Sequence, residues 1–115
     1  YGSRGPSYED RNMTLEQLEN LIAQRSSAPS GESWTAQLLE KGAEKCAEKF
    51  GEEAVELIIE AVKNDSNGLI NEAADVMYHL LVLLKSREIS LSHVMAELER
   101  RTAQSGLTEK AARKT

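Results

Sequence analysis

Cysteine is almost absent from this chain, since Cys46 is the single cysteine among 115 residues. One thiol excludes a disulfide within the chain, and such sparse use of cysteine is typical of a reducing compartment. Cys46 falls on the apolar side of a helical pattern. We therefore predict a thiol buried in the core and not a reactive one.

Long apolar runs are also missing, and the longest, Leu80 to Leu84, is far too short to span a bilayer. The start of the chain does not have the pattern of a signal peptide. We therefore expect a soluble cytoplasmic protein with no membrane partner. We interpret residues 1–13 as disordered or derived from an expression vector, residues 14–104 as one all-α domain, and residues 105–115 as a flexible basic tail.

An excess of positive charge is lacking as well. The 14 basic residues are outnumbered by 19 acidic ones, which leaves a formal net charge of −5. This balance disfavours nucleic acid or an anionic membrane as a general partner. A polyanionic substrate could bind only where a cation or a local group of lysines offsets the negative field.

Helical signals occupy most of the sequence, and no β-pattern is found. Thr14 and Gln17 form a capping box at the start of a first helix, which ends in the polar segment 26–31. From Trp34 to Lys63 one apolar stripe keeps its phase across Gly51. We therefore predict a single long helix there, bent at Gly51.

The second half of the chain predicts two more helices. Residues 64–68 read as a turn, the helix over 69–87 is apolar nearly all round, and Ser90 caps a last helix that ends before Gly106. A helix with so little polar surface must be covered on most sides, so we predict a homodimer of four-helix units with antiparallel helices. The candidates for core or interface are Leu80, Leu83 and Leu84.

Glutamates recur every four residues along the predicted long helix. The six are Glu40, Glu44, Glu48, Glu52, Glu56 and Glu60. A step of four residues drifts by about 40° around a helix, so only neighbours in the row share a face. The acids that converge are Glu52, Glu53 and Glu56, facing Glu72 and Asp75 if the two helices pack antiparallel. Facing carboxylates repel one another, and their oxygens are the ligands that Mg²⁺ prefers.

The competing interpretation is a solvated acidic face. It suits the outer glutamates, because Lys41, Lys45, Lys49 and Lys63 alternate with them and offer ion pairs. It does not suit Glu72 and Asp75, because charges buried in so apolar a helix need a purpose. His79, one turn further along, is either a hydrogen-bonded core histidine or a metal ligand, and the core role is favoured.

The acidic pattern resembles the metal-binding pattern of the all-α, MazG-like nucleoside triphosphate pyrophosphatases. Within that superfamily the chain is most similar to the phosphoribosyl-ATP pyrophosphohydrolases, over about residues 14–112. The segments that carry the resemblance are 33–42, 49–56, 72–84 and 104–110. The family pattern leads us to expect tyrosine in place of Trp34 and a β-branched aliphatic residue in place of Phe50, differences that concern fit more than chemistry.

The resemblance implies an ATP-binding hydrolase that cleaves phosphoribosyl-ATP to phosphoribosyl-AMP and pyrophosphate, the second step of histidine biosynthesis. It makes Glu53, Glu56, Glu72 and Asp75 the expected ligands of Mg²⁺. Glu52 would be a further ligand or the base that orients water, with Glu53 as a second catalytic group, and Lys49 would contact phosphate. Two alternatives stay open: a housekeeping pyrophosphatase acting on canonical or damaged dNTPs, and a non-catalytic helical dimerisation module.

Overall fold

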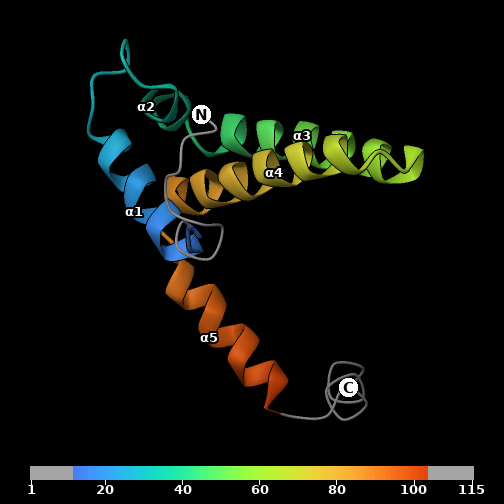
Figure 1. Ribbon diagram of the computed structural model, residues 1–115. Helices are drawn as coiled ribbons and strands as arrows, with labels where there is room; N and C mark the ends of the chain where they lie inside the picture. Colours follow the sequence, from blue (N-terminus) through green and yellow to red (C-terminus); the bar gives the residue numbers. More distant parts are fainter. Residues whose placement is uncertain (1–11, 104–115) are drawn as a thin grey trace, which may run out of the picture.

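The computed structural model describes residues 12–103, which form five helices and no strand (Figure 1). The helices are α1 (Leu15–Ser26), α2 (Trp34–Lys41), α3 (Ala43–Lys63), α4 (Ser66–Ser86) and α5 (Leu91–Thr102). The prediction of an all-α fold is confirmed. No helix in the described part is both long and apolar enough to cross a membrane.

The predicted single helix from Trp34 to Lys63 is wrong, because the chain breaks at Gly42. Gly42 has φ 97° and ψ 174°, which ends α2 and starts α3 in a new direction. Gly51, where we expected a bend, lies inside the continuous helix α3. The apolar residues keep the same helical spacing across the break because α2 and α3 both turn their apolar side to the core. Such spacing does not show whether the backbone is one continuous helix. The break also makes five helices of the expected four.

The connection between α3 and α4 is shorter than predicted. Asn64 closes α3 in the left-handed conformation with φ 62°, which asparagine tolerates better than most residues. Asp65 then caps α4, its side chain accepting the N–H of Gly68 at 3.1 Å. Ser66 to Gly68, which read as turn, are therefore the first turn of α4. Two residues join the helices, so α3 and α4 form a tight antiparallel hairpin.

The core lies at the base of this hairpin, where α1 and α2 pack against it. Its buried residues are Ile22, Leu38, Cys46, Leu81, Val82 and Leu91, so every helix contributes. Cys46 is a core thiol as predicted, since it is buried and its Sγ lies 3.4 Å from the carbonyl oxygen of Leu38. Burial raises the pKa of this thiol.

The molecule is open in shape because two parts extend beyond the core. The α3–α4 hairpin and α5 project in different directions from the α1–α2 end (Figure 1). The Cα radius of gyration is 17.0 Å, whereas a compact domain of this length has about 13 Å. Leu83 and Leu84 pack partly against the core, while Leu80 remains exposed. One chain therefore leaves much of the hairpin uncovered.

Candidate active site

Three carboxylates meet midway along the hairpin. One oxygen each from Glu53, Glu56 and Glu72 lies within 4.8 Å of the other two. Glu53 and Glu56 are neighbours on α3 because they stand three residues apart. Glu72 comes from α4 and lies beside them because it is about as far after the two-residue turn as Glu56 is before it. We call these three residues the carboxylate cluster.

Glu72 is the member of the carboxylate cluster with an unsatisfied oxygen. Its Oε1 is buried and has no hydrogen-bond partner among residues 12–103. The pKa of this carboxyl is raised, first because burial disfavours the charge and then because the carboxyls of Glu53 and Asp75 lie close. A buried, unpaired oxygen costs stability unless another group satisfies it. Oxygen donors of this number and charge fit a hard divalent cation such as Mg²⁺.

Asp75 adjoins the carboxylate cluster without belonging to the group of three. It stands one turn after Glu72 on α4, and its charge raises the pKa of Glu72 and counteracts the lowering of the pKa of His79. Of the four ligands that the resemblance implied, three have oxygens within 4.8 Å of one another, and the fourth, Asp75, stands one turn from Glu72.

Lys49 and Glu52 form an ion pair next to the carboxylate cluster. Lys49 Nζ donates to Glu52 Oε1 at 3.0 Å. The hydrogen bond raises the pKa of the lysine and lowers the pKa of the glutamate, so both groups are charged near neutral pH. Lys49 also feels the charge of Glu53. A cation and an ionised acceptor therefore flank the carboxylates.

His79 is buried as a core histidine would be, with 7% of its surface exposed, but it is not satisfied. Its Nδ1 has no hydrogen-bond partner in the described part of the chain. Burial, and next the charge of Lys49, lower the pKa of the imidazole, so it is neutral at pH 7. Sequence reasoning did not reveal this unpaired nitrogen. The charges of Lys49, Asp75 and Glu52 all act on the pKa of the imidazole.

The hydroxyl of Tyr78 fixes α4 to α2, a contact that sequence reasoning missed. Tyr78 Oη lies 2.6 Å from Thr35 Oγ1, and the tyrosine ring meets the ring of His79 edge-on at 4.9 Å. The residues are 43 apart in sequence, and nothing in their spacing indicates the contact. It holds α4 in place one turn beyond the carboxylates.

The solvated-face interpretation holds for part of the glutamate row. Glu48 pairs with Lys45 at 3.2 Å and Glu60 with Lys63 at 3.4 Å, each within one helical turn. Such exposed pairs contribute about 0–1 kcal/mol. The two pairs lie on either side of Glu56, the member of the row that belongs to the carboxylate cluster.

A groove of about 640 Å³ lies at the other end of α4, away from the carboxylate cluster. It runs between α1 and the α4–α5 connection, and its lining includes Glu19, Ile22, Lys85 and Glu88. A groove with one lysine and two carboxylates does not suit a triphosphate. The chemistry is therefore expected at the carboxylate cluster and not in this groove.

Comparison with known proteins agrees with the site. The family model described as phosphoribosyl-ATP pyrophosphohydrolase matches residues 15–102. The chain belongs to this family. A phosphoribosyl-ATP pyrophosphatase of Dinoroseobacter shibae is 63% identical over 99 residues, which cover 86% of this chain and 97% of the relative. A phosphoribosyl-ATP pyrophosphatase of Agrobacterium fabrum is 58% identical over 102 residues, covering 89% and 95%.

Membership of the phosphoribosyl-ATP pyrophosphohydrolase family confirms the resemblance seen in the sequence. The matched range contains every residue that we expected to act in the site, from Lys49 to Asp75. The segment 104–110, which also carried the resemblance, lies outside the described residues.

Proposed function

We propose that this chain hydrolyses phosphoribosyl-ATP to phosphoribosyl-AMP and pyrophosphate, the second step of histidine biosynthesis, and that it requires Mg²⁺. The observation that carries the proposal is the carboxylate cluster, drawn from two helices and including a buried oxygen without a partner. Relatives named phosphoribosyl-ATP pyrophosphatase that align with almost their whole length support the choice of substrate.

The residues that would hold the metal are Glu53, Glu56, Glu72 and Asp75. When bound, Mg²⁺ supplies positive charge against the triphosphate and a more acidic water. The chain's own part is to hold the carboxylates in place. The hairpin does so by pairing α3 with α4, so that ligands from both helices converge without a loop. Hydrolysis of a phosphoanhydride needs mainly such positioning and charge neutralisation.

Two further groups act on the substrate side of this proposal. Glu52, whose pKa is lowered by Lys49, accepts a hydrogen bond from the attacking water and orients it. Glu53, which would also hold the metal, shares this task. A carboxylate with a lowered pKa is a weak base, which favours orientation of the water over storage of its proton. Lys49 contributes its positive charge to the phosphates.

We further propose that the protein acts as a homodimer in the cytoplasm. The support is the apolar surface that one chain leaves exposed on α3, α4 and α5. Surface of this kind and extent commonly marks an interface between subunits. Light scattering at micromolar concentration measures the mass directly, and a monomeric mass in an active preparation would contradict the homodimer.

Pyrophosphate release tests the activity. With Mg²⁺, the protein should release pyrophosphate from phosphoribosyl-ATP far faster than from ATP or dNTPs, and chelation of the metal should stop the reaction. Asp75→Asn should remove most of the activity while helicity is kept, whereas Glu40→Gln, an exposed carboxylate outside the site, should leave it unchanged. Equal or faster turnover of dNTPs would favour the housekeeping pyrophosphatase, and no release from any nucleotide would favour the non-catalytic module.

A further inference from the structure

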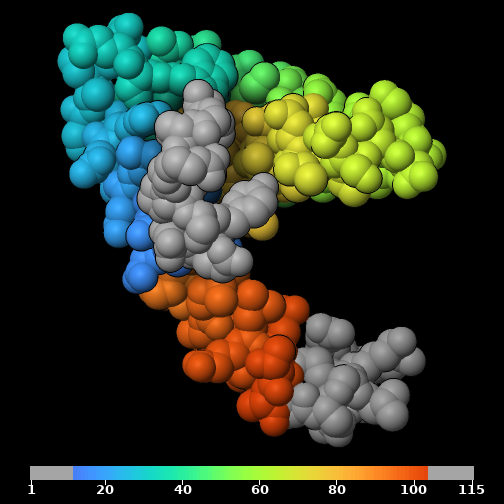
Figure 2. Space-filling view, viewed as in Figure 1, coloured from blue at the N-terminus to red at the C-terminus, as the bar shows by residue number. Residues whose placement is uncertain are grey.

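Helix α4 supplies two of the four proposed metal ligands, Glu72 and Asp75, and it is held in the fold at the base of the hairpin. In the space-filling view the hairpin projects beyond α1 and α2 (Figure 2). At the base, α4 packs against both of these helices, and its core residues Leu81 and Val82 lie there. Glu72 stands about two and a half turns before Leu81. The contacts that fix α4 at the base therefore also fix the direction in which its two carboxylates point.

A side-chain hydrogen bond joins α4 to α2 at this base. Tyr78 Oη lies 2.6 Å from Thr35 Oγ1, and Thr35 is only 2% exposed. The first turn of α2 is itself anchored, because its N-cap Ser33 accepts from the N–H of Ala36 at 3.1 Å and donates to the carbonyl oxygen of Arg25 at 2.9 Å. The hydroxyl of Thr35 is thus a fixed point for α4. We call its bond to the tyrosine the Thr35–Tyr78 tie.

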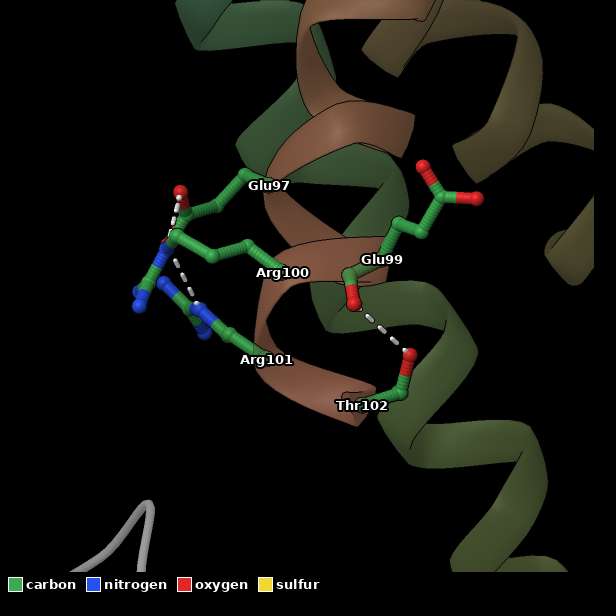
Figure 3. Close-up of polar contacts among 5 residues, drawn as sticks. All are labelled: Glu97, Glu99, Arg100, Arg101 and Thr102. Atoms are coloured by element: carbon green, nitrogen blue, oxygen red, sulfur yellow. Dashed lines mark hydrogen bonds and ion pairs between the residues drawn. The ribbon is translucent and has the colours of Figure 1, made fainter. Parts of the chain in front are cut away.

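The polar contacts of α5 show how such a tie differs from bonds within one helix. Glu97 accepts from Arg100 at 2.7 and 3.1 Å and from Arg101 at 3.0 Å, and the three side chains gather on one side (Figure 3). These bonds lower the pKa of the Glu97 carboxyl to about 2. Because donors and acceptor all belong to α5, these bonds stabilise that helix alone. The Thr35–Tyr78 tie joins residues 43 apart and restrains how two helices lie.

The Thr35–Tyr78 tie lies close to the ligands of α4. Tyr78 stands three residues after Asp75, so the two are neighbours on the helix surface, and Glu72 is one turn further back. The apolar contacts of Leu81 and Val82 are non-directional. A hydrogen bond weakens when its length or angle changes. The tie therefore resists rotation of α4 about its own axis in a way that apolar packing does not.

A small rotation of α4 is enough to disturb the metal site. A helix with its side chains has a radius of about 5–6 Å, so a rotation of about 10° moves a carboxylate by about 1 Å. Mg²⁺ requires nearly ideal octahedral geometry with ligands at about 2.0–2.1 Å. A displacement of about half that distance separates Glu72 and Asp75 from a cation that Glu53 and Glu56 of α3 hold.

We propose that Thr35 and Tyr78 are positioning residues of the metal site, because their shared hydrogen bond sets the rotation of α4 and so places Glu72 and Asp75 for Mg²⁺. The inference rests on the metal site proposed above and adds two residues that do not bind the metal themselves. Two apolar residues of the same shape would fill this place at little cost in stability. Stability alone therefore gives no reason for the pair of hydroxyls.

Removing the hydroxyls singly and together tests the Thr35–Tyr78 tie. Tyr78→Phe and Thr35→Val each leave the other hydroxyl without its partner, so each should lower the Tm. The double variant removes both hydroxyls and should regain most of that loss. Mg²⁺ is titrated by calorimetry into the metal-free protein without nucleotide. It should bind about tenfold more weakly to all three variants, the lower end of the loss that follows removal of a group that orients metal ligands.

Two controls separate positioning from stability. Thr35→Ser keeps the hydroxyl and should bind Mg²⁺ as the unsubstituted protein does. Glu19→Ala removes a different bond between helices, the one that Glu19 Oε2 accepts from the Leu91 N–H at 2.7 Å, and should lower the Tm without changing Mg²⁺ affinity. A double variant that regains Mg²⁺ affinity together with its Tm overturns the inference. Equal losses of affinity in Thr35→Ser and Thr35→Val overturn it as well.

Pyrophosphate release keeps this inference distinct from the proposed reaction. If the protein hydrolyses phosphoribosyl-ATP and every variant binds Mg²⁺ normally, the positioning role is refuted and the reaction stands. If the variants lose Mg²⁺ affinity but the unsubstituted protein releases pyrophosphate from no nucleotide, the positioning role stands and the reaction is refuted. Unsubstituted protein that binds no Mg²⁺ refutes the metal site and the positioning role together.

Discussion

Two single substitutions, Gly42→Ala and Gly51→Ala, should change the free energy of unfolding in opposite directions. Gly42 has φ 97° and ψ 174°, a region that is almost closed to residues with a Cβ. Nothing lies within 4 Å of a Cβ added there, so the cost comes from the backbone alone. Such strain amounts to about 1–3 kcal/mol. Gly42→Ala is therefore expected to destabilise the fold by about that amount.

Gly51 is the matched control because its surroundings are equally empty. It lies inside α3, and nothing lies within 4 Å of an added Cβ. Alanine in a helix interior is more stable than glycine by about 0.5–1 kcal/mol. The two variants should thus differ by about 1.5–4 kcal/mol in unfolding free energy, or by at least about 6 °C in Tm.

Urea denaturation followed by circular dichroism measures both variants against the unsubstituted chain. The measurement is repeated at tenfold dilution, because the dimerisation proposed above makes apparent stability depend on concentration. If Gly51→Ala proves the more damaging change at both concentrations, the break at Gly42 is refuted and the continuous helix predicted from the sequence is restored.

Two predictions concern charge. Glu72→Gln removes a half-buried carboxyl whose pKa is raised. Ionising this group costs stability as pH rises, so without metal the variant should melt higher than the unsubstituted protein near pH 7. Mg²⁺ should no longer raise its Tm. A Tm gain from Mg²⁺ equal to that of the unsubstituted protein would contradict the ligand role of Glu72. The second prediction concerns Glu97, whose carboxyl should titrate at about 2 by NMR. Its lowered pKa gives stability that is present above about pH 4.5 and is lost as the pH falls toward 2. In Glu97→Gln the acid loss of α5 helicity between these values should shrink, and an unchanged acid transition would argue against the two arginine bonds.

The helical fold could be predicted from the sequence because its signals are local. Thr14 and Gln17 form the capping box that the spacing predicted, and Cys46 is buried as its position on the stripe required. The two errors have the same origin. Gly42 breaks a helix without disturbing the apolar phase, and the 64–68 segment contains turn-forming residues of which three begin α4. Local composition indicates where a chain is able to turn, and only tertiary packing decides whether it does.

The carboxylate cluster was predictable for a different reason. Glu53 and Glu56 stand at i, i+3 spacing and so share a face of α3, and the short connection brings Glu72 of α4 back alongside them. Sequence spacing does not predict contacts between elements that are far apart in the chain. The bond between Thr35 and Tyr78 depends on how α2 lies across α4, and the unpaired nitrogen of His79 depends on what packs around its ring. Spacing along the chain specifies neither.

The register of the hairpin links these observations. Because two residues join α3 and α4, side chains at nearly matching steps before and after the turn are brought near one another. Three such pairs are Glu56 and Glu72, Glu53 and Asp75, and Lys49 and His79. The first pair lies in the carboxylate cluster, and the third explains why the charge of Lys49 lowers the pKa of a histidine thirty residues away. Acidic groups therefore fill the middle of this ladder, with a lysine and a neutral imidazole at the end nearer the core. Their repulsion opposes folding, and the apolar core at the base of the hairpin offsets it, so the arrangement is stable enough to hold carboxylates together where a cation can bind.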